Sequence, residues 1–176
     1  MRIIAGSHKG HTIYAPPGRD TRPTSDRVRE NTFNLIGPVE GASVLDLFAG
    51  SGALGLEALS RGAASAVFVE TDRDARRAIE RNLHKLRLTG ARVVAIDATV
   101  VLAQEAAARR KYDLVLVDPP YSMTDYDTLA RYLPSVLADD GLLVFETDAR
   151  TEPQLPLTVR TSRKYGGTRV TLFEHE

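Results

Sequence analysis

The sequence predicts an α/β fold, in which a mostly parallel sheet of seven strands is covered by helices on both faces. Short, nearly continuous apolar runs alternate with helical patterns from residue 43 to residue 146. Continuous apolar runs are typical of strands buried on both faces, and regular alternation with helices favours parallel βαβ units. The chain then ends in two extended runs joined around Gly166-Gly167, which predict a hairpin that adds one antiparallel strand.

Each predicted element has its own signal in the sequence. The predicted parallel strands cover residues 43–47, 66–70, 92–96, 113–117 and 142–146. The predicted helices between them cover residues 52–60, 72–87, 98–110 and 125–137. Asp139-Asp140-Gly141 is expected to form the turn before the last parallel strand. The closing hairpin is expected to pair residues 157–163 with residues 168–174.

The first forty residues predict a separate N-terminal extension. Two β-prone runs, 2–5 and 12–15, flank Gly6-Ser7-His8-Lys9-Gly10 and predict a small hairpin with His8 and Lys9 at its tip. Thr24 or Ser25 can cap a helix that runs to about Ile36, where Gly37-Pro38 stops it. Arg27 and Arg29 are expected to point away from the apolar face of this helix. We therefore divide the chain into an extension, residues 1–40, and one compact domain, residues 41–176.

Composition limits the possible functions. The 176-residue chain contains no cysteine, which excludes disulfides, thiolate zinc sites and a cysteine nucleophile. No apolar run is long enough to span a membrane, and the N-terminus lacks the apolar region of a signal peptide. We therefore expect a cytoplasmic protein without a membrane partner, and we expect a monomer. His8 and His11 lack a third nearby ligand, so no metal site is predicted.

Charge is unevenly distributed along a chain whose formal net charge is zero. Residues 1–29 carry a net charge of +4 and the remainder carries −4. A basic arm on an acidic body indicates contact with a polyanion at one face, although a solvated arm is the alternative. The candidate contacts to the phosphates of such a polyanion are the six basic side chains of the arm, Arg2, Lys9, Arg19, Arg22, Arg27 and Arg29.

A strand, a glycine turn and a helix follow one another over residues 43–59. The spelling Gly50-x-Gly52-x-x-Gly55 matches the dinucleotide fingerprint, so a nicotinamide or flavin cofactor stays open. Glu70 ends the next strand, where a carboxylate can accept both ribose hydroxyls of an adenosine-bearing cofactor. Asp46, just before the turn, suits a cationic group better than a pyrophosphate. S-adenosylmethionine carries a ribose and an ammonium group but no phosphate.

Asp118-Pro119-Pro120-Tyr121 leaves a buried strand at the edge where open α/β sheets bind ligands. Consecutive prolines fix φ and donate no backbone hydrogen bond, so the Pro119 carbonyl is free to act as an acceptor in the site. Asp118 adds carboxylate acceptors, and Tyr121 adds a ring on which a flat base can stack. This combination suits a planar substrate with an exocyclic amine. The alternative is a rigid turn with a core tyrosine.

Several motifs together resemble a known family. The glycine turn Asp46-Leu47-Phe48-Ala49-Gly50-Ser51-Gly52 with Asp118-Pro119-Pro120-Tyr121 resembles class I S-adenosylmethionine-dependent methyltransferases acting on amino groups of nucleobases. Three further motifs, Arg2-Ile3-Ile4-Ala5-Gly6, Arg22-Pro23-Thr24-Ser25-Asp26-Arg27-Val28-Arg29-Glu30 and the run from Gly52 to Gly62, are similar to the RsmD family. Members of that bacterial family methylate the exocyclic amine of one guanine in small-subunit (16S) ribosomal RNA. The similarity covers essentially the whole chain.

The resemblance implies a Rossmann-like class I methyltransferase fold and a set of site residues. It places the methionine end of S-adenosylmethionine on Asp46, Phe48, Ala49, Gly50, Ser51 and Gly52. It assigns the ribose to Glu70, and the adenine to Asp97 and Ala98, although relatives can carry an amide in place of Asp97. It places the chemistry on Asp118, Pro119, Pro120 and Tyr121. No metal is implied, and the partner is small-subunit ribosomal RNA or an assembly intermediate.

The base that is methylated can be argued from hydrogen bonding. Guanine offers two adjacent donors, its ring N–H and its amine, and an ionised Asp118 could accept both. Adenine offers an amine beside a ring acceptor, which an amide side chain would suit better. Asp118 therefore favours guanine, with an adenine amino-methyltransferase of DNA or RNA as the alternative. A nicotinamide-dependent oxidoreductase and a non-catalytic RNA-binding module are the remaining hypotheses.

Overall fold

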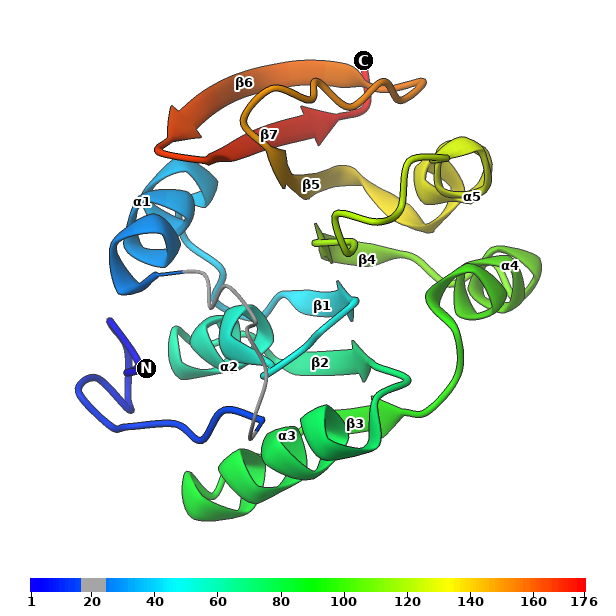
Figure 1. Cartoon of the computed structure of the whole chain (residues 1–176). Coiled ribbons are helices and arrows are strands. Elements are labelled where there is room, and N and C mark those ends of the chain that lie inside the picture. The colour runs from blue at the N-terminus through cyan, green and yellow to red at the C-terminus, as the bar shows by residue number, and fades with distance from the viewer. Residues whose placement is uncertain (17–24) are drawn as a thin grey trace.

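The structure, a computed structural model, describes residues 1–16 and 25–176 of the chain. Its sheet has seven strands in the order β3-β2-β1-β4-β5-β7-β6 (Figure 1). The strands are β1 (Ser43–Leu47), β2 (Ser65–Val69), β3 (Ala91–Val94), β4 (Tyr112–Val117), β5 (Leu137–Asp148), β6 (Thr158–Tyr165) and β7 (Thr168–Glu174). Strands β1 to β5 run parallel, and β7 is antiparallel to both of its neighbours. The predicted sheet, with one reversed strand, is confirmed.

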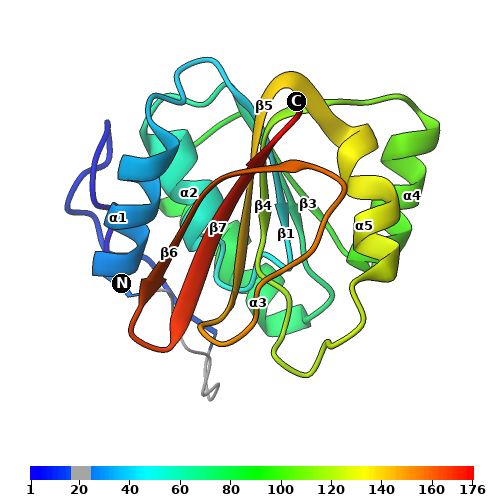
Figure 2. The ribbon, with the colours of Figure 1, turned by 90° about the horizontal axis from the view of Figure 1, so that it is seen from above.

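Helices cover both faces of the sheet, as predicted. They are α1 (Asp26–Ile36), α2 (Ala53–Ser60), α3 (Arg73–Lys85), α4 (Ala98–Ala107) and α5 (Asp127–Val136). Figure 2 shows α1 and α2 on one face and α4 and α5 on the other. The predicted cap of α1 is present, since the Ser25 hydroxyl accepts a hydrogen bond from the Val28 N–H. Within the described ranges, no helix combines the length and the apolar character that a membrane crossing requires.

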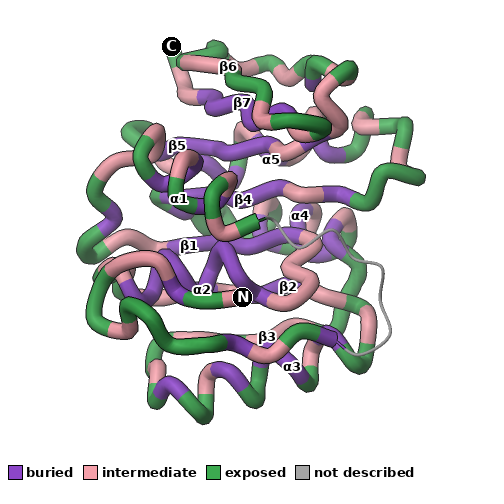
Figure 3. Tube along the Cα trace, turned by 60° about the vertical axis from the view of Figure 1, so that its left-hand side comes forward, coloured by how far each residue is buried: buried purple, intermediate pink, exposed green. Residues whose placement is uncertain are grey.

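Successive residues of the central strands point to opposite faces and form two separate cores. Val44 and Leu114 pack with residues of α1, α2 and α3, whereas Leu45 and Val115 pack with residues of α4 and α5. All four side chains are at most 2% exposed, and burial on both faces explains why these strands read as continuous apolar runs. Figure 3 shows the buried residues concentrated in the central strands. This two-sided packing fixes the strand ends that carry the polar site residues.

The start of β5 differs from the prediction. Asp139-Asp140-Gly141 was predicted as a turn before a strand, but β5 already begins at Leu137, directly after α5. Leu137 pairs with Tyr112 and Leu142 pairs with Leu114, so the strand register shifts between these two pairs. The polar residues are therefore accommodated as an irregularity inside the strand pairing instead of a separate turn.

The N-terminal segment does not form the predicted pair of strands. Arg2 and Thr12 make a single isolated β-bridge. Backbone hydrogen bonds between residues 1–3 and 10–13 accompany this bridge. The segment is also held by the buried Glu57 carboxylate of α2, whose two oxygens accept the N–H groups of Ile4 and Ala5 at 2.8 and 3.0 Å. Asn82 of α3 holds the segment further along, through hydrogen bonds with the backbone of residue 14. The division of the chain at residue 40 stays a prediction.

Gly6 lies where this segment approaches α2 most closely. Its φ is +87°, and a Cβ atom added there would lie 1.9 Å from the Ser60 carbonyl oxygen. Gly10 has nearly the same φ, +85°, but a Cβ there would meet no atom within 4 Å. Substitution of these two glycines therefore distinguishes the energetic cost of backbone strain, which both positions share, from the cost of steric overlap, which arises only at Gly6.

We expect Gly6→Ala to lower the free energy of unfolding considerably more than Gly10→Ala. Gly10→Ala should cost about 1–2 kcal/mol, the cost of a left-handed backbone at a residue with a Cβ. Gly6→Ala should cost about 1–3 kcal/mol more, because it also overpacks the contact with α2. Urea unfolding of both variants measures the difference. Equal losses would show that the segment is not closely docked on α2.

Candidate active site

One pocket of about 950 Å³ lies at the carboxyl ends of the parallel strands. This volume is at the upper end of the range usual for small-molecule and cofactor sites. The pocket is lined by both of the motifs that sequence analysis selected, the glycine turn after β1 and the turn after β4. Among the predicted cofactor and catalytic residues, Gly52 alone does not line it. Gly52 is the residue before α2, and its φ of +78° lets the backbone turn from the loop into the helix.

The turn after β1 is held by two carboxylates. Asp46, 2% exposed, accepts a hydrogen bond from the Gly55 N–H at 3.1 Å. A Cβ at Gly55 would lie 2.9 Å from the same carboxylate oxygen and 2.3 Å from the Phe68 ring, so only glycine fits there. Phe48 adopts φ +56°, which is rare for a residue with a side chain. Such backbone strain is often found at functional sites and supports a functional role for this turn.

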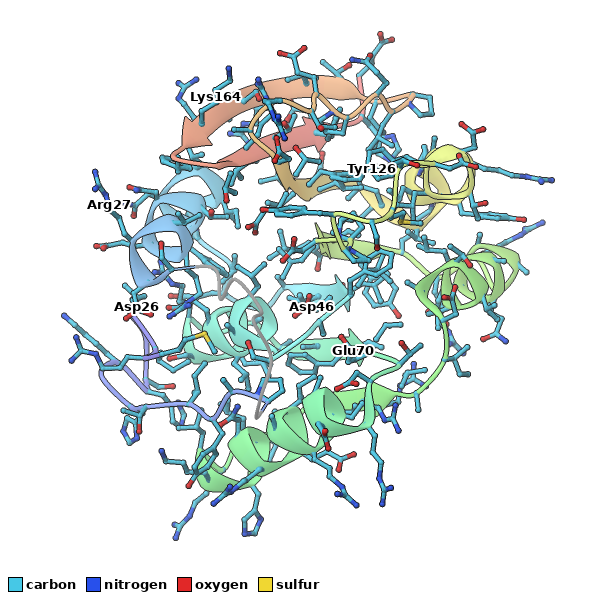
Figure 4. All side chains as sticks on the ribbon, viewed as in Figure 1. Asp26, Arg27, Asp46, Glu70, Tyr126 and Lys164 are labelled. Carbon is cyan, nitrogen blue, oxygen red and sulfur yellow. The ribbon has the colours of Figure 1, made fainter. Side chains whose placement is uncertain are left out.

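Glu70 connects the ends of β1 and β2. One of its carboxylate oxygens accepts the Gly50 N–H and the other accepts the Asp72 N–H, each at 2.8 Å. The carboxylate is thus fixed in orientation at the pocket wall, where Figure 4 shows it near Asp46. A carboxylate oxygen has two lone pairs, so each can accept a further hydroxyl donor from a ligand.

Asp97 caps the helix α4 at the far end of the pocket. One carboxylate oxygen accepts the Thr99 N–H at 2.9 Å and also the Thr99 hydroxyl. These hydrogen bonds, the hydroxyl one foremost, lower the pKa of Asp97 and keep it ionised. Asp97 and Ala98 line the pocket next to Ile96, whose side chain is 41% exposed. This end can therefore offer both an acceptor and an apolar contact to a flat ring.

The turn after β4 brings the second motif to the pocket. Asp118 is half-buried, Pro119 is buried, and Tyr121 is 47% exposed at the rim. The turn is closed by the Pro120 carbonyl, which accepts the Met123 N–H at 2.9 Å. Because Tyr121 is exposed and lines the pocket, it is not a core tyrosine, which was the alternative considered for this motif.

Asp118 belongs to a group of three carboxyls on one face of the sheet. Strand register pairs Asp46 with Leu116 and Val117 with Phe145, which places Asp46, Asp118 and Glu146 on the same face. Burial, then Glu146 and then Asp46, raises the pKa of Asp118 well above its usual value. Burial likewise raises the pKa of Asp46, with a smaller contribution from Glu70. Among the described residues, no cation offsets the desolvation of Asp46 and Asp118.

The electrostatic character of the pocket follows from its whole lining. Six acidic side chains line it, and none of its described lining residues is a lysine or an arginine. The six are Asp46, Glu70, Asp72, Asp97, Asp118 and Glu146. Such a lining attracts a cationic ligand and disfavours a pyrophosphate, which usually binds helix N-termini and basic side chains.

Comparison with known proteins gives the family. Residues 1–174 match the family described as conserved hypothetical protein 95. The chain belongs to this family. It is the RsmD family, whose motifs the sequence resembles, and its match extends over nearly the whole chain.

Individual relatives agree with the assignment to the RsmD family. The YlbH protein of Bacillus subtilis is 41% identical over 183 residues, which cover 99% of this chain and 98% of YlbH. Ribosomal RNA small subunit methyltransferase D of Escherichia coli is 42% identical over 151 residues, which cover 84% of this chain and 75% of that protein. The solved structure of YhhF from Escherichia coli, 37% identical, matches with a TM-score of 0.88 over 100% of this chain and 98% of YhhF. The fold is that of class I methyltransferases.

Of the six predicted RNA contacts of this RsmD-family chain, three are exposed, one is buried and two lie outside the described residues. Arg2, Lys9 and Arg27 are exposed, and Figure 4 shows Arg27 projecting outward from α1. Arg19 and Arg22 lie outside the described residues. Arg29 was predicted to point outward, and this prediction is wrong. Its side chain is 0% exposed, and it contacts the buried Glu57 at 3.4 Å and Asp26 at 2.9 Å. Arg29 thus joins α1 to α2 and is not available to RNA phosphates.

Sequence analysis missed several pocket residues, of which Glu146 is the most informative. Thr71, Asp72 and Ile96 also line the pocket, next to predicted residues of the family motifs. Glu146 is the last residue of the predicted strand over 142–146, and its position is equivalent to those of Glu70 and Asp118 at other strand ends. The rule that parallel strands end at the ligand edge could therefore have identified it.

Proposed function

We propose that this protein transfers a methyl group from S-adenosylmethionine to the exocyclic amine (N2) of a guanine in small-subunit ribosomal RNA. The observation that carries the proposal is that the glycine turn after β1 and Asp118-Pro119-Pro120-Tyr121 line one acidic pocket. The named relative in Escherichia coli, which is a small-subunit ribosomal RNA methyltransferase, supports the substrate class. The substrate is the RNA or an assembly intermediate, and the protein would act on it as a monomer in the cytoplasm.

The chain's residues suit S-adenosylmethionine better than a dinucleotide. When bound, this cofactor supplies an electrophilic methyl group on a positively charged sulfur. Asp46, desolvated and with no strong cationic partner in the described part of the chain, suits the ammonium group at the methionine end. Glu70 has its orientation fixed by two backbone N–H groups and suits the ribose hydroxyls. Asp97 and Ala98 would contact the adenine, and Phe48, Ala49 and Ser51 would line the methionine end.

The target base would be held from the opposite side of the pocket. Asp118 and the Pro119 carbonyl would accept hydrogen bonds from the amine and direct its lone pair toward the methyl group. Tyr121, exposed at the rim, would stack on the base, a contact worth about 1–3 kcal/mol. Positioning of this kind can supply most of the rate of a direct displacement. A paired base cannot enter such a pocket, so the target would be extruded from its stack.

The raised pKa of Asp118 gives the second candidate, an adenine amino-methyltransferase, a specific basis. A protonated carboxyl offers one donor and one acceptor, as an amide does, and this pattern matches adenine.

The two candidates differ in the product nucleoside. We expect small ribosomal subunits from cells that lack this protein to gain a methylguanosine when incubated with the purified enzyme and labelled S-adenosylmethionine. Methyladenosine as the product would support the second candidate, and no transfer to RNA would contradict both.

The exposed arginine of α1 gives a test of the RNA surface. We expect Arg27→Gln to weaken binding to small-subunit ribosomal RNA and to reduce the slope of log affinity against log salt by about 1, because one phosphate contact is lost. Arg77→Gln, an exposed arginine on α3 outside the pocket, is the matched control and should leave the slope unchanged. Binding measured by filter retention across a salt series checks this. An unchanged slope for Arg27→Gln would mean that Arg27 is solvated in the complex.

A further inference from the structure

We propose that Glu146 reads the ring N1–H of the target guanine and thereby determines that this enzyme selects guanine over bases with an unprotonated N1. This inference rests on the proposed function and adds a specificity residue to it. Glu146 lies on β5, outside all of the motifs that carry the family resemblance, and it lines the same pocket as Asp118.

The geometry of the sheet places Glu146 beside Asp118. Val117 pairs with Phe145 in parallel register, so Asp118 and Glu146 are the next residues of neighbouring strands. Neighbouring strands are about 4.8 Å apart, and in-register side chains of parallel strands point to the same face. The order of carboxyls across the pocket is therefore Asp46 on β1, Asp118 directly after β4 and Glu146 on β5.

This order matches the order of groups in the proposed complex. The cofactor turn lies after β1, so Asp118 is the carboxyl next to the transferred methyl group, and Glu146 is one strand farther away. A guanine whose amine is held at Asp118 has its ring N1–H directly beside that amine along the Watson–Crick edge. The longer glutamate side chain on β5 can reach back to this N1–H.

The charge of the carboxyl pair explains why guanine would be preferred even when Asp118 is protonated. After burial, the nearby Glu146 is the next largest cause that raises the pKa of Asp118, so a charged Glu146 favours the protonated form of Asp118. A pair that shares one proton still keeps one carboxylate, and a carboxylate is an acceptor only. Guanine presents donors at both adjacent positions. Adenine would place a lone pair against the carboxylate, and the resulting repulsion, with one acceptor unpaired, disfavours its binding.

The test uses 2-aminopurine, which keeps the exocyclic amine at C2 but has no hydrogen on N1. Small subunits are reconstituted with RNA that carries either guanine or 2-aminopurine at the mapped target position. We expect the wild-type enzyme to methylate the guanine substrate at least about 100-fold faster, because a site built to bind an N–H group discriminates strongly against its absence. We expect Glu146→Gln to lower the rate on guanine and to reduce the guanine to 2-aminopurine ratio at least tenfold, because an amide can donate to the unprotonated N1.

Controls separate this role from a structural one. Asp148→Asn changes the next acidic residue on the same face of β5, which does not line the pocket, and should keep the wild-type ratio. Glu146→Gln should bind S-adenosylhomocysteine with wild-type affinity and melt at the wild-type temperature or higher.

If Glu146→Gln methylates guanine with an unchanged ratio of guanine to 2-aminopurine rates, the inference is wrong while the proposed function stands. If the wild-type enzyme methylates no guanine, the proposed function itself is wrong. If Glu146→Gln misfolds, Glu146→Asp takes its place. This variant keeps the charge but moves it away from the N1–H, so it should lower the rate on guanine more than the rate on 2-aminopurine.

Discussion

Asp118→Ala is expected to abolish methyl transfer, with kcat at least about 100-fold below wild type, while the affinity for S-adenosylmethionine stays within about twofold. The loss is expected because Asp118 is the side chain that holds the amine in the near-attack position, and a misplacement of about 1 Å can cost about 100-fold in rate. Cofactor affinity should stay, since the turn after β1 is held by hydrogen bonds to Asp46 and Glu70, and neither bond involves Asp118. Single-turnover kinetics on small ribosomal subunits and calorimetric titration with the cofactor measure the two quantities.

The control for this experiment lies in the same loop. Asp125 is exposed, does not line the pocket, and accepts a hydrogen bond from the Asp127 N–H at 2.9 Å at the start of α5. Asp125→Ala should keep both kcat and cofactor affinity. Wild-type turnover in Asp118→Ala would contradict the role assigned to Asp118, whereas loss of turnover in both variants would indicate a general effect on the loop.

Local patterns predicted the sheet and the pocket because each depends on short-range signals. Buried strands such as β1 and β4 are continuous apolar runs, and a polar residue at the end of such a strand lies at the ligand edge by topology. Asp46, Glu70 and Asp118 were selected in this way, and all three line the pocket. Their roles toward cofactor and base stay predictions.

Contacts between distant segments could not be predicted from local patterns. Arg29 looks like any basic residue on a helix, and its burial depends on Glu57, which is 28 residues away in the sequence. The N-terminal segment has β-prone runs, but its backbone N–H groups bond to the Glu57 carboxylate more than 50 residues away. These tertiary hydrogen bonds dock the segment on α2 in addition to the single β-bridge between the two runs, and nothing in the two runs themselves indicates this.

Asp46→Asn is expected to weaken binding of S-adenosylmethionine by about 10- to 100-fold and, at the same time, to stabilise the cofactor-free protein near neutral pH. The first effect follows because a hydrogen bond to a charged group is worth about 1.5–3 kcal/mol, and the substitution removes the charge that would face the ammonium group. Calorimetric titration measures the affinity. Asp74→Asn, at an exposed position in the first turn of α3, is the control and should keep wild-type affinity.

The second effect follows from the direction of the pKa shift. Burial raises the pKa of Asp46 in the folded protein above its ordinary value of 3.8. The folded state therefore holds this proton more tightly than the unfolded state, so the associated stability is complete below pH 3.8 and is lost as the pH rises through the raised pKa. Asparagine carries no such penalty, so Asp46→Asn should melt at a higher temperature than wild type at pH 8, and the difference should shrink on acidification toward pH 4. Saturating S-adenosylmethionine should reverse the order at pH 8, because it stabilises by mass action only the protein that binds it. A lower melting temperature for Asp46→Asn at every pH would mean that Asp46 is a structural brace of the turn, and its assignment to the cofactor would fail.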